Sequence, residues 1–282
     1  MGITVNTNMQ ALRIQHNLDT ATSKMDTSME RMSSGSRINS AKDDAAGLAV
    51  STTLKNTISS SKIATDNVNI GSDMLSTAEG TLDVISNNLG RIRDLTEQAS
   101  NGTYSSDDLA AISAEVGKRI TMIDNLATST AFNGIKLLDG TATAGITIQI
   151  GTGAAATDSL TLDSSIFARV SMATSLGGLT DAISAGVPAN TSAYLSIIDS
   201  AVKDLTARVT SIGAAQNQLS AVSDGLEVQQ QNLTAALSTI QDADIASESA
   251  TYVQQQILQS ASASLLVQAN SAPQIALTLI KG

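Results

Sequence analysis

A heptad pattern between Leu195 and Ile240 constrains this chain more than any other feature of its sequence. Apolar residues recur there at alternating intervals of three and four, and no proline interrupts them. The second position of each heptad is always aliphatic, whereas the first is polar at Gln216, Ser223 and Gln230. A repeat sustained this far predicts a long helix that buries one stripe against partner helices. At about 1.5 Å per residue it would be roughly 70 Å long, so its partners must also be long.

Other stretches have the pattern of such partners. The run 45–98 contains no proline and carries an aliphatic seam, which predicts a very long helix. Ser105 has the chemistry of a helix cap, and it predicts a third helix over about 105–127. Residues 5–32 keep the same three-four spacing, and Gly35 is a suitable C-terminal cap. We expect the helices 45–98 and 109–127 to pack with 195–240 in an antiparallel bundle.

The stretch 37–47 between the first two helices is mixed in character. Ser40 is a candidate N-cap, with Asp43 three residues later in the first turn. Asp43 and Asp44 could be considered a carboxylate pair for metal or acid–base chemistry. Adjacent residues point about 100° apart on a helix, so they share a site poorly. We therefore expect a structural role at a helix start or a subunit contact.

The periodicity changes after the third helix. Asn133-Gly134 is a strong signal for a tight hairpin turn. Residues 146–150 and 160–162 alternate apolar and polar side chains, as strands do. The stretch 139–192 has little charge and much Gly, Ala, Ser and Thr. It predicts a small strand-and-loop elaboration.

The last stretch of the chain is unusual in its charge. Residues 249–280 contain no Asp, Glu, Lys or Arg, and apolar residues occur there at helical spacing. A free monomer would expose much of this apolar surface. Such a segment indicates a buried interface, or a segment that folds only on assembly.

Composition excludes several classes of function. Cysteine is absent and His16 is the one histidine, so disulfides, thiolate metal sites and thiol catalysis are excluded. The net charge of −10 argues against nucleic acid and against anionic membrane surfaces as partners. We expect no catalytic, metal or cofactor site and no enzymatic activity. No apolar run is long enough for a membrane-spanning helix, and the first residues lack signal-peptide character. These signals alone predict a cytoplasmic protein.

Several motifs resemble those of one family, and they occur in that family's order. They are VNTN (5–8), RMSSGSRINSAKDDAAGLAVS (31–51), NNLGRIRDLTEQASNGTYS (87–105), FNGIKLLDG (132–140), AAQNQL (214–219), IQDADIASE (240–248) and SASLLVQANSAPQIALTLIKG (262–282). Together they resemble bacterial flagellin over about 1–140 and 193–282. The middle, 141–192, does not match and is short, so the chain is similar to a core-only flagellin without large outer domains.

The resemblance implies a mainly α, elongated antiparallel bundle that polymerises into a filament for motility. It implies an N-terminal inner-core helix and linker at 1–44, an outer-core bundle at 45–240 with a β-rich elaboration at about 132–192, and a C-terminal inner-core helix at 241–282. It also implies export through the flagellar type III channel to the extracellular filament, which replaces the cytoplasmic prediction. The implied partners are further copies of the chain, an export chaperone, and the filament cap and hook-junction proteins.

The resemblance also implies two sets of functional residues. In flagellins recognised by the vertebrate flagellin-sensing Toll-like receptor, the matching contact positions are here Arg91, Arg93, Leu95, Gln98 and Glu115. Gly90 stands where the family often has Gln, which removes one possible contact. The expected polymerisation and chaperone segments carry the apolar residues Leu12, Leu18, Met25, Val253, Ile257, Leu265, Leu266, Ile275 and Leu279.

Other functions remain open on the residues. A hook–filament junction protein shares the end helices, although the intact 33–47 motif and the complete C-terminal match favour flagellin. A peptidase insert would need a His-Glu-x-x-His pair, which one histidine excludes. A type III translocator or coiled-coil adaptor would not account for the ordered motifs.

Overall fold

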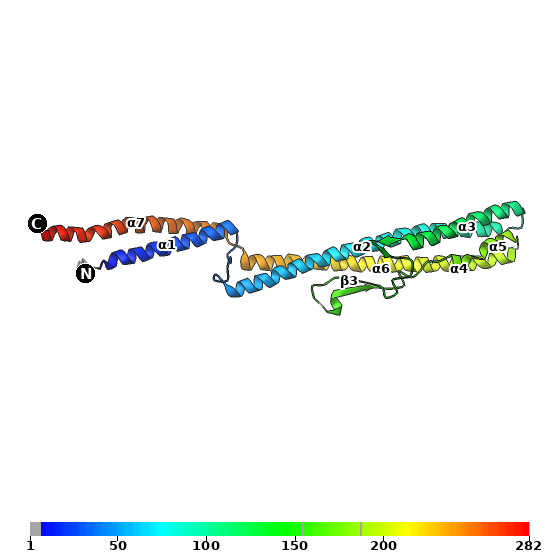
Figure 1. Ribbon diagram of the computed structural model, residues 1–282, viewed down its shortest axis with the longest axis horizontal. Coiled ribbons are helices and arrows are strands. Elements are labelled where there is room, and N and C mark those ends of the chain that lie inside the picture. The colour runs from blue at the N-terminus through cyan, green and yellow to red at the C-terminus, as the bar shows by residue number, and fades with distance from the viewer. Residues whose placement is uncertain (1–6, 154, 187, 282) are drawn as a thin grey trace. The chain divides into compact units, whose positions relative to one another are not determined.

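The computed structural model describes residues 7–153, 155–186 and 188–281, with the backbone alone for 156, 188, 189 and 272–281. Its helices are α1 (Met9–Ser34), α2 (Ala45–Ala99), α3 (Ser106–Ser129), α4 (Ala173–Leu176), α5 (Leu179–Ser184), α6 (Pro188–Gln241) and α7 (Ile245–Lys281) (Figure 1). Its strands are β1 (Ala131–Phe132), β2 (Ile135–Lys136), β3 (Ile146–Gln149) and β4 (Ser159–Leu162). The mainly α fold with long helices and small antiparallel strand pairs confirms the predicted fold class.

Contacts divide the chain into two compact units. The terminal unit comprises Met1–Ile58 and Gln231–Gly282, and the central unit comprises Ser59–Gln230. Helices α2 and α6 each contribute residues to both units.

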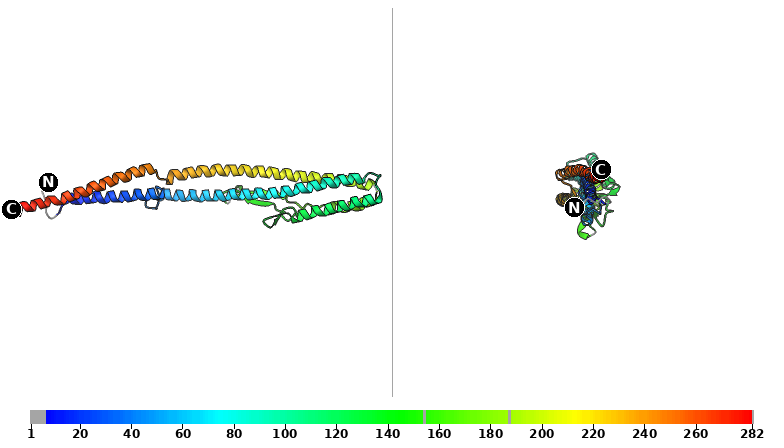
Figure 2. Two further views of the ribbon diagram at one scale, coloured as in Figure 1. Left: turned by 90° about the horizontal axis from the view of Figure 1, so that it is seen from above. Right: turned by 90° about the vertical axis from the view of Figure 1, so that its left-hand side faces the viewer.

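Helices α2 and α6 run antiparallel in the central unit (Figure 2). Arg93 pairs with Asp199, and Glu79 accepts a hydrogen bond from Gln216, so the residue numbers rise along α2 as they fall along α6. Within the central unit the second positions of the predicted heptads are buried, whereas the first positions are only half-buried. The buried ones are Ile198, Leu205, Ile212, Leu219 and Leu226. The seam thus uses the row that is always aliphatic, and Gln216 pairs with the polar groups of Ser76 and Glu79 on α2.

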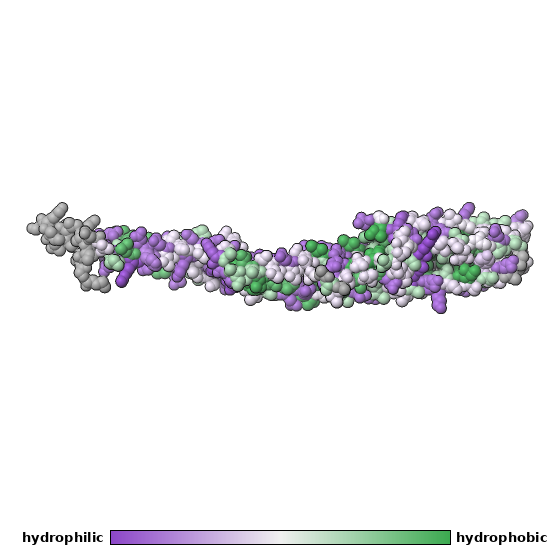
Figure 3. Space-filling model, turned by 60° about the horizontal axis from the view of Figure 1, so that its bottom comes forward, coloured by the Kyte–Doolittle hydropathy of each residue, from purple (hydrophilic) through white to green (hydrophobic). Residues whose placement is uncertain are grey.

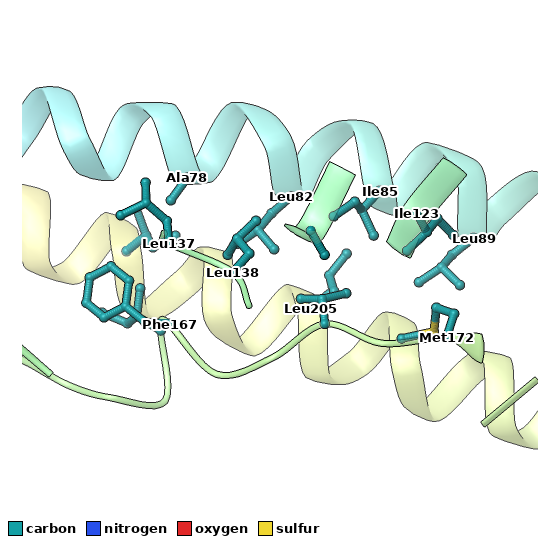
Figure 4. Packing of buried hydrophobic residues seen from close by; sticks show 14 of the residues in the cluster. Ala78, Leu82, Ile85, Leu89, Ile123, Leu137, Leu138, Phe167, Met172 and Leu205 are labelled. Carbon is teal, nitrogen blue, oxygen red and sulfur yellow. The ribbon is translucent and has the colours of Figure 1, made fainter. Parts of the chain in front are cut away.

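The facing side of α2 carries the aliphatic seam that its sequence predicts. Val68, Leu75, Ala78, Leu82, Ile85, Leu89 and Ile92 are all buried in one core cluster. Figure 4 shows Ala78, Leu82, Ile85 and Leu89 pointing from α2 toward Leu137, Leu138, Phe167 and Leu205. Helix α3 adds Ile112, Val116, Ile120 and Ile123 to the same cluster.

Local chemistry sets the ends of α3. Ser105 and Asp108 form a reciprocal capping box at its start, with Ser105 Oγ accepting from the Asp108 amide. After the helix, Asn133 (φ 46°) and Gly134 (φ 81°) both adopt positive φ. That backbone is what a tight two-residue hairpin turn requires, and β1 pairs with β2 on either side of it. Both the cap and the hairpin are confirmed.

The predicted strand-and-loop character of 139–192 is only partly right. Strands β3 and β4 pair antiparallel, with Ile146 opposite Leu162 and Gln149 opposite Ser159. The stretch also contains α4 and α5, and α6 begins within it at Pro188. Both short helices are held by tertiary burial of Leu176, Leu179 and Ile183. One or two helical turns are too short for a periodic signal, and Gly177-Gly178 between them masks the spacing further.

The β3–β4 pair is fixed to α2 by a close approach at Gly71. A methyl group at this position would clash with Ile148 Cδ1 of β3 and would lie 3.6 Å from Leu219 Cδ1 of α6. Beside it, Asn67 Nδ2 donates to the Gln149 carbonyl at 3.2 Å. Gly71 therefore supplies the notch in which the buried Ile148 side chain sits.

We predict different effects on stability when the same substitution is made at two glycines of α2. Gly80→Ala should stabilise the protein by about 0.5–1 kcal/mol, because alanine is the better helix former and nothing lies within 4 Å of the new methyl group. Gly71→Ala should be less stable than Gly80→Ala by about 1–3 kcal/mol, because Ile148 must leave its notch. Urea unfolding of the monomer measures both, and equal stabilisation would contradict the Gly71–Ile148 packing.

Candidate assembly and recognition surfaces

Helices α1 and α7 form an antiparallel pair in the terminal unit, as Figure 1 shows. Asn8 Nδ2 donates to the Ala269 carbonyl at 2.8 Å, and Gln259 Nε2 donates to Thr22 Oγ1 at 3.1 Å. Further along, Arg31 pairs with Glu248 at 3.1 Å. Polar contacts thus run along the seam of this pair.

The seam between α1 and α7 is built from small and polar residues. On α1 the buried residues are Ala21 and Ser28, and among the described side chains of α7 they are Gln255 and Ala269. Leu18, Met25 and Leu266 flank this seam and are half-buried. Small side chains bring the helix backbones close together, but they bury little apolar area. Packing within the pair therefore leaves most of its large apolar side chains outside.

Those large side chains face outward on the same two helices. Leu12, Val253, Ile257 and Leu265, four residues of the expected polymerisation segments, are exposed. A groove of about 610 Å³ lies on α7 and is lined by Ser249, Ala250, Val253, Gln254, Ile257 and Leu258. The side chains of Ile275 and Leu279 lie outside the described part of the chain. This outward face, defined as Leu12, Val253, Ile257, Leu258 and Leu265, is apolar and uncharged.

The connection from α1 to α2 is held by hydrogen bonds at both ends. Gly35 takes φ 70° as the predicted cap, its carbonyl accepts from the Ala243 amide, and the Arg37 amide donates to the Gln241 carbonyl. The predicted N-cap at Ser40 is wrong, because residues 37–44 are not helical. Asp44 caps α2 instead, since its carboxylate accepts from the Gly47 amide at 2.9 Å.

Asp43 has a different role in the same connection. Its Oδ2 accepts from Ser40 Oγ and from the Ser40 amide, both at 2.9 Å, and from the Asn39 amide at 3.2 Å. The hydrogen bond from the Ser40 hydroxyl lowers the pKa of Asp43 below its ordinary value. Asp43 and Asp44 therefore stabilise a turn and a helix start, as the structural interpretation expected.

The residues that resemble receptor contacts lie on α2 and α3 of the central unit. Glu115 Oε1 accepts from Arg91 Nε at 3.3 Å and from Arg119 Nε at 3.0 Å. Arg93 donates to Asp199 at 2.7 Å, and Gln98 donates to the Tyr104 hydroxyl at 2.7 Å. All four of these predicted side chains are at least partly accessible, and each has a polar partner.

Leu95 differs from the other residues of this set. Its side chain is only 2% exposed and belongs to the core cluster, whereas Arg91 is exposed. Leu95 is therefore not part of the exposed surface to which Arg91 belongs. Leu95 can influence a surface only by supporting the backbone beneath it.

Two residues that sequence reasoning missed, Arg119 and Asn88, complete the cluster of polar side chains around Glu115. Arg119 bridges Glu115 and the Asn88 carboxamide, which accepts from it at 3.0 Å. The four-residue spacing of Glu115 and Arg119 was the signal that could have found the pair. The hydrogen bond from Arg119, followed by the contribution of Arg91, lowers the pKa of Glu115.

Other site chemistries find no support in the described residues. No group of three or more His, Asp or Glu side chains among them could hold a metal ion. No helix in the described part of the chain has the length and apolar character needed to cross a membrane.

Comparison with known proteins gives two family matches. The bacterial flagellin N-terminal helical region matches residues 5–143, and the bacterial flagellin C-terminal helical region matches residues 195–280. Together they cover more than half of the chain.

The chain belongs to the bacterial flagellin family.

Individual relatives match over nearly their whole length. The flagellin of Xenorhabdus nematophila is 35% identical, with 100% of both chains covered. The flagellin of Listeria monocytogenes is 35% identical, covering 98% of this chain and 99% of its own. Polar flagellin F of Vibrio parahaemolyticus is 30% identical, covering 99% of this chain and 100% of its own. This flagellin is thus a structural subunit of the extracellular flagellar filament, a polymer of its own copies.

A solved structure supports the fold. A Vibrio parahaemolyticus protein provisionally described as flagellar hook-associated superposes with a TM-score of 0.59 at 18% identity, covering 71% of this chain and 100% of its own. Residues 144–194 of this flagellin lie outside both family matches. They contain β3, β4, α4, α5 and the start of α6.

The lowered pKa of Glu115 predicts a pH-dependent contribution to stability. Because the folded pKa lies below the unfolded value of about 4.3, the contribution is present above that pH and is lost as pH falls through the folded value. Glu115→Gln should therefore lower stability to urea at pH 7 and have little effect near pH 3. Asp66→Asn, which removes an exposed carboxylate of α2, serves as the control. An effect of Glu115→Gln that persists at pH 3 would contradict the ion-pair assignment.

Proposed function

We propose that copies of this flagellin polymerise through the outward apolar face of α1 and α7. The observation that carries the proposal is how side chains are distributed on this helix pair, with small and polar ones facing the partner helix and large apolar ones facing outward. Its own seam holds small and polar residues, while Val253, Ile257 and Leu265 are exposed. Exposed apolar patches of this kind mark protein–protein contacts.

Charge explains why the contact face should be uncharged. Each copy carries a net charge of −10, so neighbouring copies repel one another at long range. A contact made by α7 between residues 249 and 280 brings no charged side chain of that helix into the interface. Burying a Val, Leu or Ile side chain contributes about 1.5–3 kcal/mol. Several such residues per copy give stable association without one dominant contact.

The apolar face of α7 would need to be covered before the chain is exported and assembled. An exposed apolar helix would cause premature polymerisation inside the cell, so an export chaperone covering α7 would keep the chain monomeric. Export through the flagellar type III channel then delivers the chain to the growing filament. The filament cap and the hook-junction proteins would contact the subunits at the two ends of the polymer.

Two adjacent leucines of α7 test the outward face directly. Leu265→Gln should prevent polymerisation while leaving the monomer folded, because Leu265 is 52% exposed. Leu266→Gln should instead weaken the α1–α7 pair, because Leu266 is half-buried against its seam. Sedimentation measures polymerisation, and circular dichroism measures helix content. Normal filaments from the Leu265→Gln variant would contradict the proposal.

Removing the whole uncharged segment should have a stronger effect. Deletion of 249–282 is expected to leave a soluble monomer, because the core of the central unit contains no residue of that segment. Electron microscopy should show no filaments, and filaments formed by the truncated chain would refute the assignment.

For the full chain, long filaments from purified protein would exclude the alternative of a hook–filament junction protein, which stops at a ring.

We also propose that the monomer is a ligand of the vertebrate flagellin-sensing Toll-like receptor. Arg91, Arg93, Gln98 and Glu115 support this through their resemblance to the contact residues of recognised flagellins. The ion pair between Arg91 and Glu115 holds both side chains between α2 and α3.

A reporter-cell assay tests the receptor proposal. The monomer should activate the receptor at nanomolar concentration, and Arg91→Ala should reduce the response by tenfold or more, an effect of about 1.4 kcal/mol. Lys62→Ala, elsewhere on α2, is the control for loss of one positive charge. No response to the wild-type monomer, where a known agonist responds, would exclude this activity.

A further inference from the structure

Two Asn-Gly pairs occur in the chain, Asn101-Gly102 and Asn133-Gly134. An asparagine followed by glycine is open to a reaction within its own backbone, because glycine has no side chain to block the approach. The glycine nitrogen loses its proton and attacks Cγ of the asparagine, and the side-chain amide takes up a proton and leaves as ammonia. Both asparagines are exposed, so the local structure of each turn decides which pair can react.

Asn101-Gly102 lies in the turn that joins α2 to α3, and Figure 2 shows α3 folding back along α2 from that turn. The turn begins with the hydrogen bond from the Asn101 amide to the Gln98 carbonyl, which is 3.1 Å long. Within the described residues, neither the Asn101 carboxamide nor the Gly102 amide makes a hydrogen bond. A Cβ on Gly102 would meet nothing within 4 Å. The reacting groups are therefore unpaired, and the backbone around them has room to rotate.

Asn133-Gly134 is held in the β1–β2 hairpin. Asn133 takes φ 46° and Gly134 takes φ 81°, and Phe132 pairs with Ile135 across the turn. Closing a ring between the asparagine side chain and the next backbone nitrogen requires rotation about the Cα–C bond of the asparagine. The paired strands oppose that rotation, because it would break their hydrogen bonds. The two Asn-Gly pairs thus have the same chemistry and differ in how firmly the fold restrains them.

We propose that Asn101 is a site of spontaneous deamidation in the folded protein. Attack by the Gly102 nitrogen on Cγ forms a cyclic imide and releases ammonia. Water then opens the imide. Cleavage of the bond between Cγ and the nitrogen leaves aspartate, whereas cleavage of the bond between the main-chain carbonyl carbon of residue 101 and the nitrogen leaves isoaspartate. Water is the one co-reactant, and nothing is oxidised or reduced.

The products fit the turn without disturbing its neighbours. The Asn101 side chain is exposed and has no hydrogen bond to lose within the described residues. Across the turn, Gln98 Nε2 donates to the Tyr104 hydroxyl at 2.7 Å, a contact that involves neither reacting group. Figure 3 shows hydrophilic residues scattered over the face that it presents, so a further carboxylate joins a surface that already contains many polar groups. The modified monomer should therefore keep its fold.

Deamidation would give the filament a chemical record of its age. Each reaction makes the net charge of −10 more negative by one unit. The imide opens irreversibly in water, and a subunit of an extracellular filament is beyond the reach of enzymes inside the cell. Copies modified at Asn101 accumulate with time, whereas the restrained Asn133 stays largely intact.

The two Asn-Gly pairs of the full-length chain test the proposal against each other. The purified monomer is incubated at mildly alkaline pH, which favours loss of the glycine proton, and peptide mass spectrometry follows both asparagines over time. Asn101 should deamidate at least about tenfold faster than Asn133, because paired strands restrain only the latter. In concentrated urea, where neither turn persists, the two rates should become similar.

Two results in this experiment would overturn the proposal. One is an equal or faster reaction at Asn133 in the folded monomer. The other is an Asn101 that stays unmodified in the folded monomer while the chain in urea reacts.

Two variants test the chemistry and its effect on the fold. Gly102→Ala should slow deamidation of Asn101 by about tenfold or more, because its methyl group hinders the attacking nitrogen, and should leave the rate at Asn133 unchanged. An unchanged rate at Asn101 would overturn the reaction through the imide. Asn101→Asp reproduces the charge of the product, and its circular dichroism and urea unfolding should match those of wild type. A loss of stability would contradict the open turn.

Filaments test the accumulation directly. Filaments collected at increasing times after growth should contain a rising fraction of modified Asn101. A fraction that stays constant with filament age would overturn the record of time.

Discussion

The aliphatic seam between α2 and α6 is the interaction on which the central unit depends. Leu205, Ile212 and Leu219 of α6 are buried against the aliphatic row of α2, and α3 adds a third apolar stripe. Apolar burial of about 25 cal/mol per Å² makes such a seam the dominant stabilising term. The hairpin β1–β2, the pair β3–β4, and α4 and α5 all add residues to or pack against this core, so their positions follow from it.

The terminal unit uses the same helical geometry with the opposite distribution of side chains. In the central unit the seam itself is built from large aliphatic residues, which are buried in one core cluster. Between α1 and α7 the seam contains Ser28 and Gln255, while Ile257 and Leu265 face outward. Apolar area that would stabilise an isolated helix pair is thereby left for contact with neighbours. The lack of charge along 249–280 allows that contact in a chain with a net charge of −10.

The sequence was sufficient for features that arise from local pattern. Heptad spacing predicted α6 and its antiparallel partner α2, and Asn133-Gly134 predicted the hairpin, because backbone conformation there follows from the residues themselves. Asp44 as the cap of α2 was not predicted, since Ser40 offered an equally good cap and only the path of the connection decides between them. Helices α4 and α5 depend on burial by distant residues, so no short pattern marks them.

The candidate surfaces were less predictable for a related reason. On α7, Leu265 and Leu266 are neighbours of equal hydrophobicity, and only the position of α1 determines which one faces outward. On α2, Leu95 carries the family's contact pattern but is buried by the core. Arg119 joined the charged cluster because α3 packs beside Asn88 of α2. These outcomes are properties of tertiary packing, not of spacing along one helix.

The central claim is that the large apolar side chains left outside the α1–α7 pair form contact surfaces between copies. A cryo-electron microscopy structure of the filament at side-chain resolution tests it most directly. The account predicts that Ile257 and Leu265 of α7 are covered by neighbouring subunits. Filaments in which these side chains face solvent would contradict it.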